Sequence, residues 1–94
     1  MPRPIHPGEI LADELKELDI SPTELARQID VPPNRISQIV NGKRAITGDT
    51  ALRLGHWFDT SPQFWLTLQA AYEIELAQQT AGRKIARLPR RPAA

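Results

Sequence analysis

The chain has 94 residues, with 12 Lys and Arg against 11 Asp and Glu, two histidines and no cysteine. This length suits one domain that buries roughly 60–65% of its unfolded surface, and it leaves no room for a deep enzyme cleft. Disulfides and thiolate metal sites are excluded, and nothing resembles a signal peptide or a membrane-spanning run of roughly 20 apolar residues. We therefore expect a cytoplasmic domain without a metal or cofactor.

The net charge of +1 hides an uneven distribution of charged residues. Residues 3–19 contain two basic and five acidic side chains, a net charge of −3, and residues 20–48 have a net charge of +2. Residues 80–94 contain five basic side chains and no acidic one. Such segregation indicates separate surfaces for different partners, although a charge run can also be a plain solvated face.

Apolar residues recur at helical spacing and nowhere alternate with period two, which predicts an all-α fold. A first helix is expected from about Pro7 to Leu18, with an inward face of Ile10, Leu11, Leu15 and Leu18. A second helix opens with a capping box, in which the Ser21 hydroxyl accepts from the Glu24 amide and the Glu24 carboxylate reaches back. Its buried face is Leu25, Ala26 and Ile29.

Three further helices complete the prediction. One runs from Pro33 to Asn41-Gly42, with Ile36, Ile39 and Val40 facing inward. The next follows a Thr47 cap and carries Ala51, Leu52, Leu54 and Phe58. The last opens at Ser61-Pro62 and ends near Gln79, carrying Phe64, Trp65, Leu68, Ala71, Tyr72 and Leu76. We expect residues 1–80 to form the domain, and residues 81–94 to form a mobile basic tail.

The segment Pro22–Asn41 has the pattern of a helix-turn-helix. Ala26 is small enough for two helices to cross closely, Asp30 is a residue that tolerates positive φ, and Val31 can plug the turn. Glycine would be the more usual choice at Asp30, so aspartate there costs about 1 kcal/mol. This geometry would place the second helix, the recognition helix, in the major groove of DNA.

The outward side chains of the recognition helix are of the types that read base edges. We expect Asn34, Arg35, Ser37 and Gln38 to contact bases, and Thr23, Asn41, Lys43 and Arg44 to contact phosphates. The alternative is an ordinary helical hairpin with a polar outer face. DNA reading is favoured because no acidic residue occurs between Val31 and Gly48, whereas a solvated helix usually carries Glu and Lys.

The aromatic residues are confined to the chain after residue 56. They could simply be core, but their clustering at the predicted fifth helix favours a two-fold interface. A dimer also suits DNA half-sites roughly 34 Å apart. The predicted interface residues are Trp57, Phe64, Trp65, Leu68 and Tyr72.

Several motifs resemble those of HigA-type antidote proteins of toxin–antitoxin modules, within the Xre/Cro-like (lambda-repressor-like) regulators. The matching segments are His6-Pro7-Gly8-Glu9-Ile10-Leu11, Leu25-Ala26, Asn34-Arg35-Ile36-Ser37, Asn41-Gly42-Lys43-Arg44, Ala51-Leu52-Arg53-Leu54, Ser61-Pro62, Phe64-Trp65-Leu66 and Leu68-Gln69-Ala70-Ala71-Tyr72. The resemblance implies a nucleoid-associated homodimer that binds its operator, represses its own operon and neutralises a RelE-like (HigB-type) mRNA-cleaving toxin. Pro32 departs from the Ser or Thr that often caps the recognition helix in the family.

Three hypotheses for the function are open: an antitoxin and autorepressor, a stand-alone regulator, and an enzyme. An acidic face on the first helix, formed by Asp13, Glu14 and Glu17, is a candidate toxin-facing surface or a plain solvated face. The chain could instead be a stand-alone regulator with no toxin. An enzyme has almost no support, because no nucleophile–base pair, metal cluster or glycine-rich phosphate loop is present.

Overall fold

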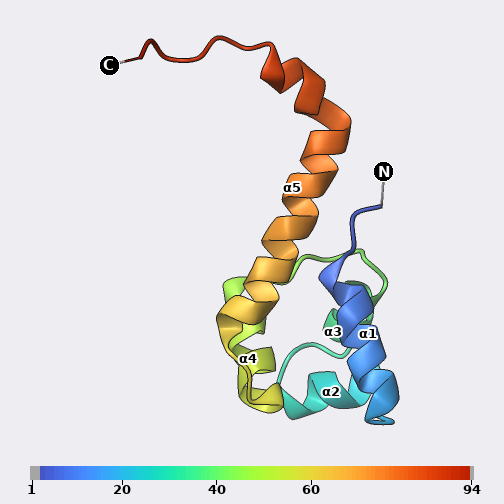
Figure 1. Cartoon of the computed structure of the whole chain (residues 1–94). Helices are drawn as coiled ribbons and strands as arrows, with labels where there is room; N and C mark the ends of the chain where they lie inside the picture. Colours follow the sequence, from blue (N-terminus) through green and yellow to red (C-terminus); the bar gives the residue numbers. More distant parts are fainter. Residues whose placement is uncertain (1–2, 94) are drawn as a thin grey trace.

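The computed structural model describes residues 3–93, so Met1 and Pro2 of the expected domain and Ala94 of the expected tail lie outside the described residues. Residues 3–93 form five α-helices and no strand, which confirms the predicted all-α class. The helices are α1 (Pro7–Glu17), α2 (Pro22–Gln28), α3 (Arg35–Val40), α4 (Gly48–Phe58) and α5 (Pro62–Ala86) (Figure 1).

Two helices begin with the predicted Ser-Pro device. The Ser21 hydroxyl accepts from the amide of Glu24 at 3.1 Å, and the Ser61 hydroxyl accepts from the amide of Phe64 at 3.2 Å. Each bond satisfies an amide that has no partner within its own helix. The second half of the predicted capping box is wrong, because the Glu24 carboxylate binds the guanidinium of Arg27 one turn further along.

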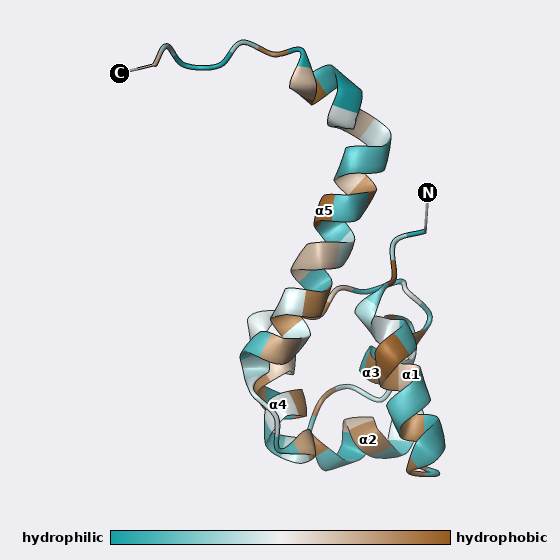
Figure 2. Cartoon of the chain, viewed as in Figure 1, coloured by the Kyte–Doolittle hydropathy of each residue, from teal (hydrophilic) through white to brown (hydrophobic). Residues whose placement is uncertain are grey.

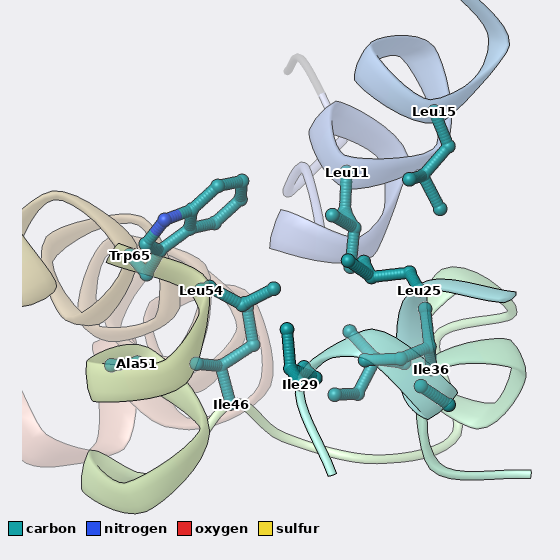
Figure 3. Close-up of a cluster of buried hydrophobic side chains, with 11 residues drawn as sticks. Leu11, Leu15, Leu25, Ile29, Ile36, Ile46, Ala51, Leu54 and Trp65 are labelled. Carbon is teal, nitrogen blue, oxygen red and sulfur yellow. The ribbon is translucent and has the colours of Figure 1, made fainter. Parts of the chain in front are cut away.

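The core is a cluster of buried apolar side chains to which all five helices contribute (Figure 3). Its largest fully buried members include Trp65, Leu11, Leu25, Ile36, Ile39 and Leu54. Leu18, predicted to face inward, is exposed instead, and Leu52 of α4 is exposed as well. Leu18 follows the last turn of α1, and Leu52 lies about 100° around α4 from Ala51, which faces the core.

The recognition helix α3 begins at Arg35, two residues later than expected from Pro33. Neither Pro32 nor Pro33 has an amide proton, and Asn34 makes no capping hydrogen bond with its side chain. The amide of Arg35 bonds to the carbonyl of Pro32 at 2.9 Å and closes a turn before the helix. The family's usual capping hydroxyl is therefore replaced by a backbone turn.

The α5 helix continues to Ala86, so the predicted end near Gln79 and the tail boundary at residue 81 are wrong for residues 81–86. The apolar pattern stops because α5 leaves the body of the protein, as Figures 1 and 2 show, and not because the helix stops. Gly82 costs only about 1 kcal/mol in a helix, and the first helix-breaking proline is Pro89. None of the described helices is both long enough and apolar enough to span a membrane.

The protrusion of α5 dominates the dimensions of the molecule. The structure measures 52 × 29 × 21 Å, and its radius of gyration is 16.4 Å. A compact chain of this length would have a radius of gyration of about 12 Å. We call the part of α5 that extends beyond the body of the protein its outer part. It is mostly hydrophilic (Figure 2), apart from single exposed residues such as Ile74 and Ile85.

Candidate nucleic-acid interface

The turn between α2 and α3 has the geometry predicted from the sequence. Asp30 has a φ of 58°, in the left-handed region, and the amide of Val31 bonds to the carbonyl of Ala26 at 3.0 Å. Ala26 is completely buried at the crossing of the two helices, and Val31 packs against the core. The turn therefore directs α3 away from α2 at a fixed angle.

Helix α4 holds this turn through Arg53, a role that the sequence did not reveal, and through Trp57, which the sequence predicted only as part of a dimer interface. Arg53 donates from Nη1 to the carbonyls of Ile29 at 2.8 Å and Asp30 at 3.1 Å. One helical turn further along, Trp57 donates from Nε1 to Oε1 of Gln28 at 2.8 Å. The two Arg53 bonds satisfy backbone carbonyls just after α2 that have no helical partner, and all three bonds attach α2 and its turn to α4.

The inward face of α3 determines which of its residues face outward. Ile36 and Ile39 are fully buried, so Asn34, Arg35 and Gln38 lie toward the surface, as predicted. Asn34 is exposed, whereas Arg35 and Gln38 are partly buried. The Nε atom of Arg35 is buried and has no hydrogen-bond partner.

Two of these outward side chains already have partners within the protein. The Ser37 hydroxyl donates to the carbonyl of Asn34 at 3.0 Å. Nε of Arg44 donates to Oε1 of Gln38 at 2.8 Å. The outer surface of α3 is thus partly held in place by hydrogen bonds within the protein.

The chain reverses direction directly after α3. Gly42 has a φ of 73°, and the amide of Lys43 bonds to the carbonyl of Gln38 at 2.8 Å. The side chains predicted to contact phosphates are all exposed: those of Thr23, Asn41, Lys43 and Arg44. The reversal places Lys43 and Arg44 beside the recognition helix, where the bond from Arg44 to Gln38 forms.

The start of α1 packs against α3 and the loop that follows it through His6 and Gly8. The sequence did not reveal these roles. Nδ1 of His6 accepts from the amide of Gly8 at 2.9 Å, and its ring meets the ring of Tyr72 edge-on at 4.9 Å. Burial lowers the pKa of His6, against opposing effects from the negative charge of Glu9 and from a hydrogen bond to the backbone of Arg44. Gly8 lies so close to α3 that a Cβ atom there would be 1.8 Å from the carbonyl oxygen of Ile39.

A second capping interaction at α1 involves Glu9. Its carboxylate accepts from the amide of His6 at 3.3 Å and from both terminal nitrogens of Arg3, at 2.6 and 2.7 Å. The hydrogen bonds from Arg3 lower the pKa of Glu9 to about 2. Glu9 therefore caps the start of α1 and also forms an ion pair with Arg3 on the surface.

Gln69 connects α5 to the loop after the recognition helix. Its Oε1 accepts from the amide of Ile46 at 2.8 Å, and its Nε2 donates to the carboxylate of Glu73 at 2.9 Å. Gln69 is buried, although its sequence neighbours gave no reason to expect this. A usable signal was its spacing of four residues from Trp65, which places both on the inward side of α5.

Known relatives share both the sequence and the fold of this chain. The pattern of the helix-turn-helix family matches residues 11–65. A HigA-family addiction-module antidote protein from Coxiella burnetii is 52% identical, with a TM-score of 0.93 over 98% of this chain and 100% of that one. The chain belongs to the HigA family of helix-turn-helix antidote proteins. The resemblance inferred from the motifs is confirmed.

Two further relatives extend the comparison. The Pseudomonas aeruginosa antitoxin HigA, solved with the higBA promoter, is 47% identical, with a TM-score of 0.91 over 97% of this chain and 100% of that one. Virulence-associated protein I of Dichelobacter nodosus is 49% identical over 76 residues, or 80% of this chain and 70% of its own. The family is one of helix-turn-helix antitoxins and regulators and not of enzymes, which eliminates the enzyme alternative. Within residues 3–93, no three His, Asp or Glu side chains gather as a metal site requires.

The aromatic cluster of this HigA-family chain is divided between core and surface. Trp65 is only 1% exposed and packs against Phe58 and Phe64, so its assignment to a dimer interface is wrong. A side chain this deeply buried in the monomer has no surface to offer a second copy. Phe64 is 44% exposed, and Trp57, Leu68 and Tyr72 are partly buried.

The acidic residues of α1 lie away from the core of this HigA-family domain. Asp13, Glu14 and Glu17 are exposed on α1, whereas Leu11 and Leu15 of the same helix are buried. The three carboxylates thus form one accessible negative surface on α1.

Proposed function

We propose that this chain is an antitoxin that neutralises a RelE/HigB-like mRNA-cleaving toxin and represses its own operon by binding operator DNA as a dimer. The observation that carries the proposal is the surface of α3 and the following loop. It presents Arg35, Lys43 and Arg44 with polar side chains between them, and no acidic residue occurs from Val31 to Gly48. The HigA of P. aeruginosa, which shares this fold, was solved with promoter DNA.

The proposed base-contacting residues are Asn34, Arg35, Ser37 and Gln38. They follow the turn at Asp30 and occupy the part of a recognition helix that enters deepest into the major groove. The proposed phosphate contacts flank them and are all exposed: Thr23, Asn41, Lys43 and Arg44.

Gel shifts with the DNA upstream of the gene test this interface. Arg35→Ala removes a side chain that can bind guanine in a bidentate manner, and it should weaken binding by about 1–3 kcal/mol. Arg83→Ala removes an exposed charge from the outer part of α5 and is the matched control. Lys43→Ala should weaken binding to all sequences and reduce the salt dependence by about one phosphate contact. Equal affinities of Arg35→Ala and wild type would contradict the base-reading assignment.

We further propose that the exposed aromatic face of α5, with Phe64, Leu68 and Tyr72, and the neighbouring Trp57 form the dimer interface. Phe64 is the most exposed of the four, whereas the other three are partly buried. Phe64→Glu should therefore convert a dimer into a monomer in sedimentation at micromolar concentration. The control is Ile85→Glu, which places the same charge at an exposed site on the outer part of α5. A dimer that survives Phe64→Glu and dissociates with Ile85→Glu would place the interface elsewhere.

The toxin-facing surface is proposed to be the acidic face of α1, because ribosome-dependent RNases are basic proteins. Reversing Asp13 and Glu17 to lysine should abolish co-purification with the protein encoded by the adjacent reading frame. Glu75→Lys, on the exposed part of α5, is the control. A neighbouring gene without a small basic RelE-like product would support the alternative of a stand-alone regulator.

A further inference from the structure

The hydrogen bond between Gln38 and Arg44 fixes the orientation of a proposed base-reading side chain. Nε of Arg44 lies 2.8 Å from the Oε1 atom of Gln38. An arginine side chain has only donors, so the amide atom facing Arg44 must be the oxygen and not the nitrogen. The two N–H groups of the Gln38 amide are therefore directed away from Arg44.

The backbone favours this pairing. The left-handed Gly42, with a φ of 73°, turns the chain back at the end of α3. The amide of Lys43 then bonds to the carbonyl of Gln38 at 2.8 Å, which brings the next residue, Arg44, alongside the Gln38 side chain. The contact thus follows from the way α3 ends, although both side chains reach solvent.

Base edges in the major groove differ in their donors and acceptors. Guanine presents two acceptors and thymine one, whereas adenine presents an acceptor beside a donor and cytosine a donor. A glutamine that is free to rotate pairs with adenine by using its oxygen and its nitrogen together. With the oxygen side occupied by Arg44, Gln38 is left with its nitrogen as the group that meets a base.

We propose that Gln38, oriented by Arg44, reads a guanine or thymine in the operator and does not read adenine. This inference rests on the proposed function, since it assumes that Gln38 enters the major groove. Arg44 then acts as a positioning residue for base selection in addition to any contact with phosphate. Its remaining guanidinium donors stay available for the DNA.

The test is a binding selection on duplexes randomised over about 20 base pairs, two helical turns of DNA, with base preference as the readout. Wild type should enrich guanine or thymine at the position that Gln38 controls. That position is identified as the one at which Gln38→Glu loses this preference, because glutamate keeps the acceptor for Arg44 and lacks a donor. Binding of Gln38→Glu to the wild-type sequence should fall at least tenfold.

Two variants distinguish the orienting of Gln38 by Arg44 from the general effect of a positive charge near the DNA. Arg44→Met releases the Gln38 amide and should admit adenine at the same position. Lys43→Met removes a neighbouring charge without touching Gln38, and it should lower affinity while leaving the preference unchanged. Adenine enriched by wild type, or a preference unaffected by Arg44→Met, would overturn the inference and leave the proposed function standing. Failure of wild type to enrich any sequence would overturn both.

Discussion

Replacing Gly8 by alanine tests whether α1 and the recognition helix must approach as closely as the structure shows. The added Cβ would lie 1.8 Å from the carbonyl oxygen of Ile39 and 2.7 Å from its carbonyl carbon. Carbon–oxygen contacts of this kind are normally about 3.3 Å, so one helix must move by about 1.5 Å. The obstacle is backbone and cannot rotate aside as a flexible side chain would.

Overpacking of a core costs typically about 1–3 kcal/mol, and the rigid obstacle at Ile39 places Gly8→Ala at the upper end of this range. At about 4–8 °C per kcal/mol for a domain of this size, the midpoint of thermal unfolding should fall by about 12–24 °C. Circular dichroism at a fixed protein concentration measures this midpoint. Operator binding, measured well below the midpoint, should also weaken, because the carbonyl that is displaced belongs to α3.

Gly48→Ala is the control for Gly8→Ala. A Cβ at Gly48 would meet nothing within 4 Å, so this variant should be neutral or more stable by up to about 1 kcal/mol. Unfolding of Gly8→Ala within about 3 °C of Gly48→Ala, together with wild-type binding to operator DNA, would show that α1 and α3 need not approach this closely.

Further predictions concern the caps and the turn. Because burial lowers the pKa of His6 below 6.5, the unfolded chain binds this proton more readily, and stability should fall as the pH drops below about 6.5; His6→Asn keeps a capping acceptor and should flatten this part of the pH–stability curve. Arg3→Ala should return the pKa of Glu9, followed by NMR, from about 2 toward its ordinary value of 4.5, and a Glu9 pKa that stays near 2 would contradict the role of Arg3. Arg53→Met should lower stability by about 1–3 kcal/mol, because the carbonyls at the end of α2 lose their charged donor, with denaturant unfolding as the measurement. Asp30→Ala should cost about 1 kcal/mol more than Asp30→Asn, since asparagine tolerates the left-handed conformation.

Local chemistry explains the parts of the fold that the sequence predicts well. Ser21 and Ser61 cap their helices through contacts only three residues long, and Asp30 takes its left-handed conformation within a single turn. The inward face of α3 also follows from a short period, because Ile36 and Ile39 need only be on one side of a helix. Such features depend on neighbours along the chain and can be recognised there.

The residues that hold the candidate interface in place depend on distant partners. Arg53 bonds to carbonyls 23 and 24 residues away, and Gln69 bonds to an amide 23 residues away. In the sequence, Arg53 is an ordinary charge on an amphipathic helix, and Gln69 is an ordinary polar residue on another. Only the packing of α4 and α5 gives these donors and acceptors their backbone partners, so no local pattern indicates the partners, although the spacing of Gln69 from Trp65 does indicate that Gln69 is buried.

The α5 helix shows why a hydrophobic pattern predicts burial better than it predicts helix. Its first turns complete the core through Trp65, and its pattern fades where the helix no longer has a body to pack against. The loss of the hydrophobic pattern predicts a helix end near Gln79, although most residues up to Ala86 have good helical propensity. The assignment of Trp65 to the dimer interface is wrong for a similar reason. Aromatic clustering alone does not distinguish a side chain buried in the core of the monomer from one that packs against a second copy. Phe64, its neighbour, is the residue whose exposure makes that distinction testable.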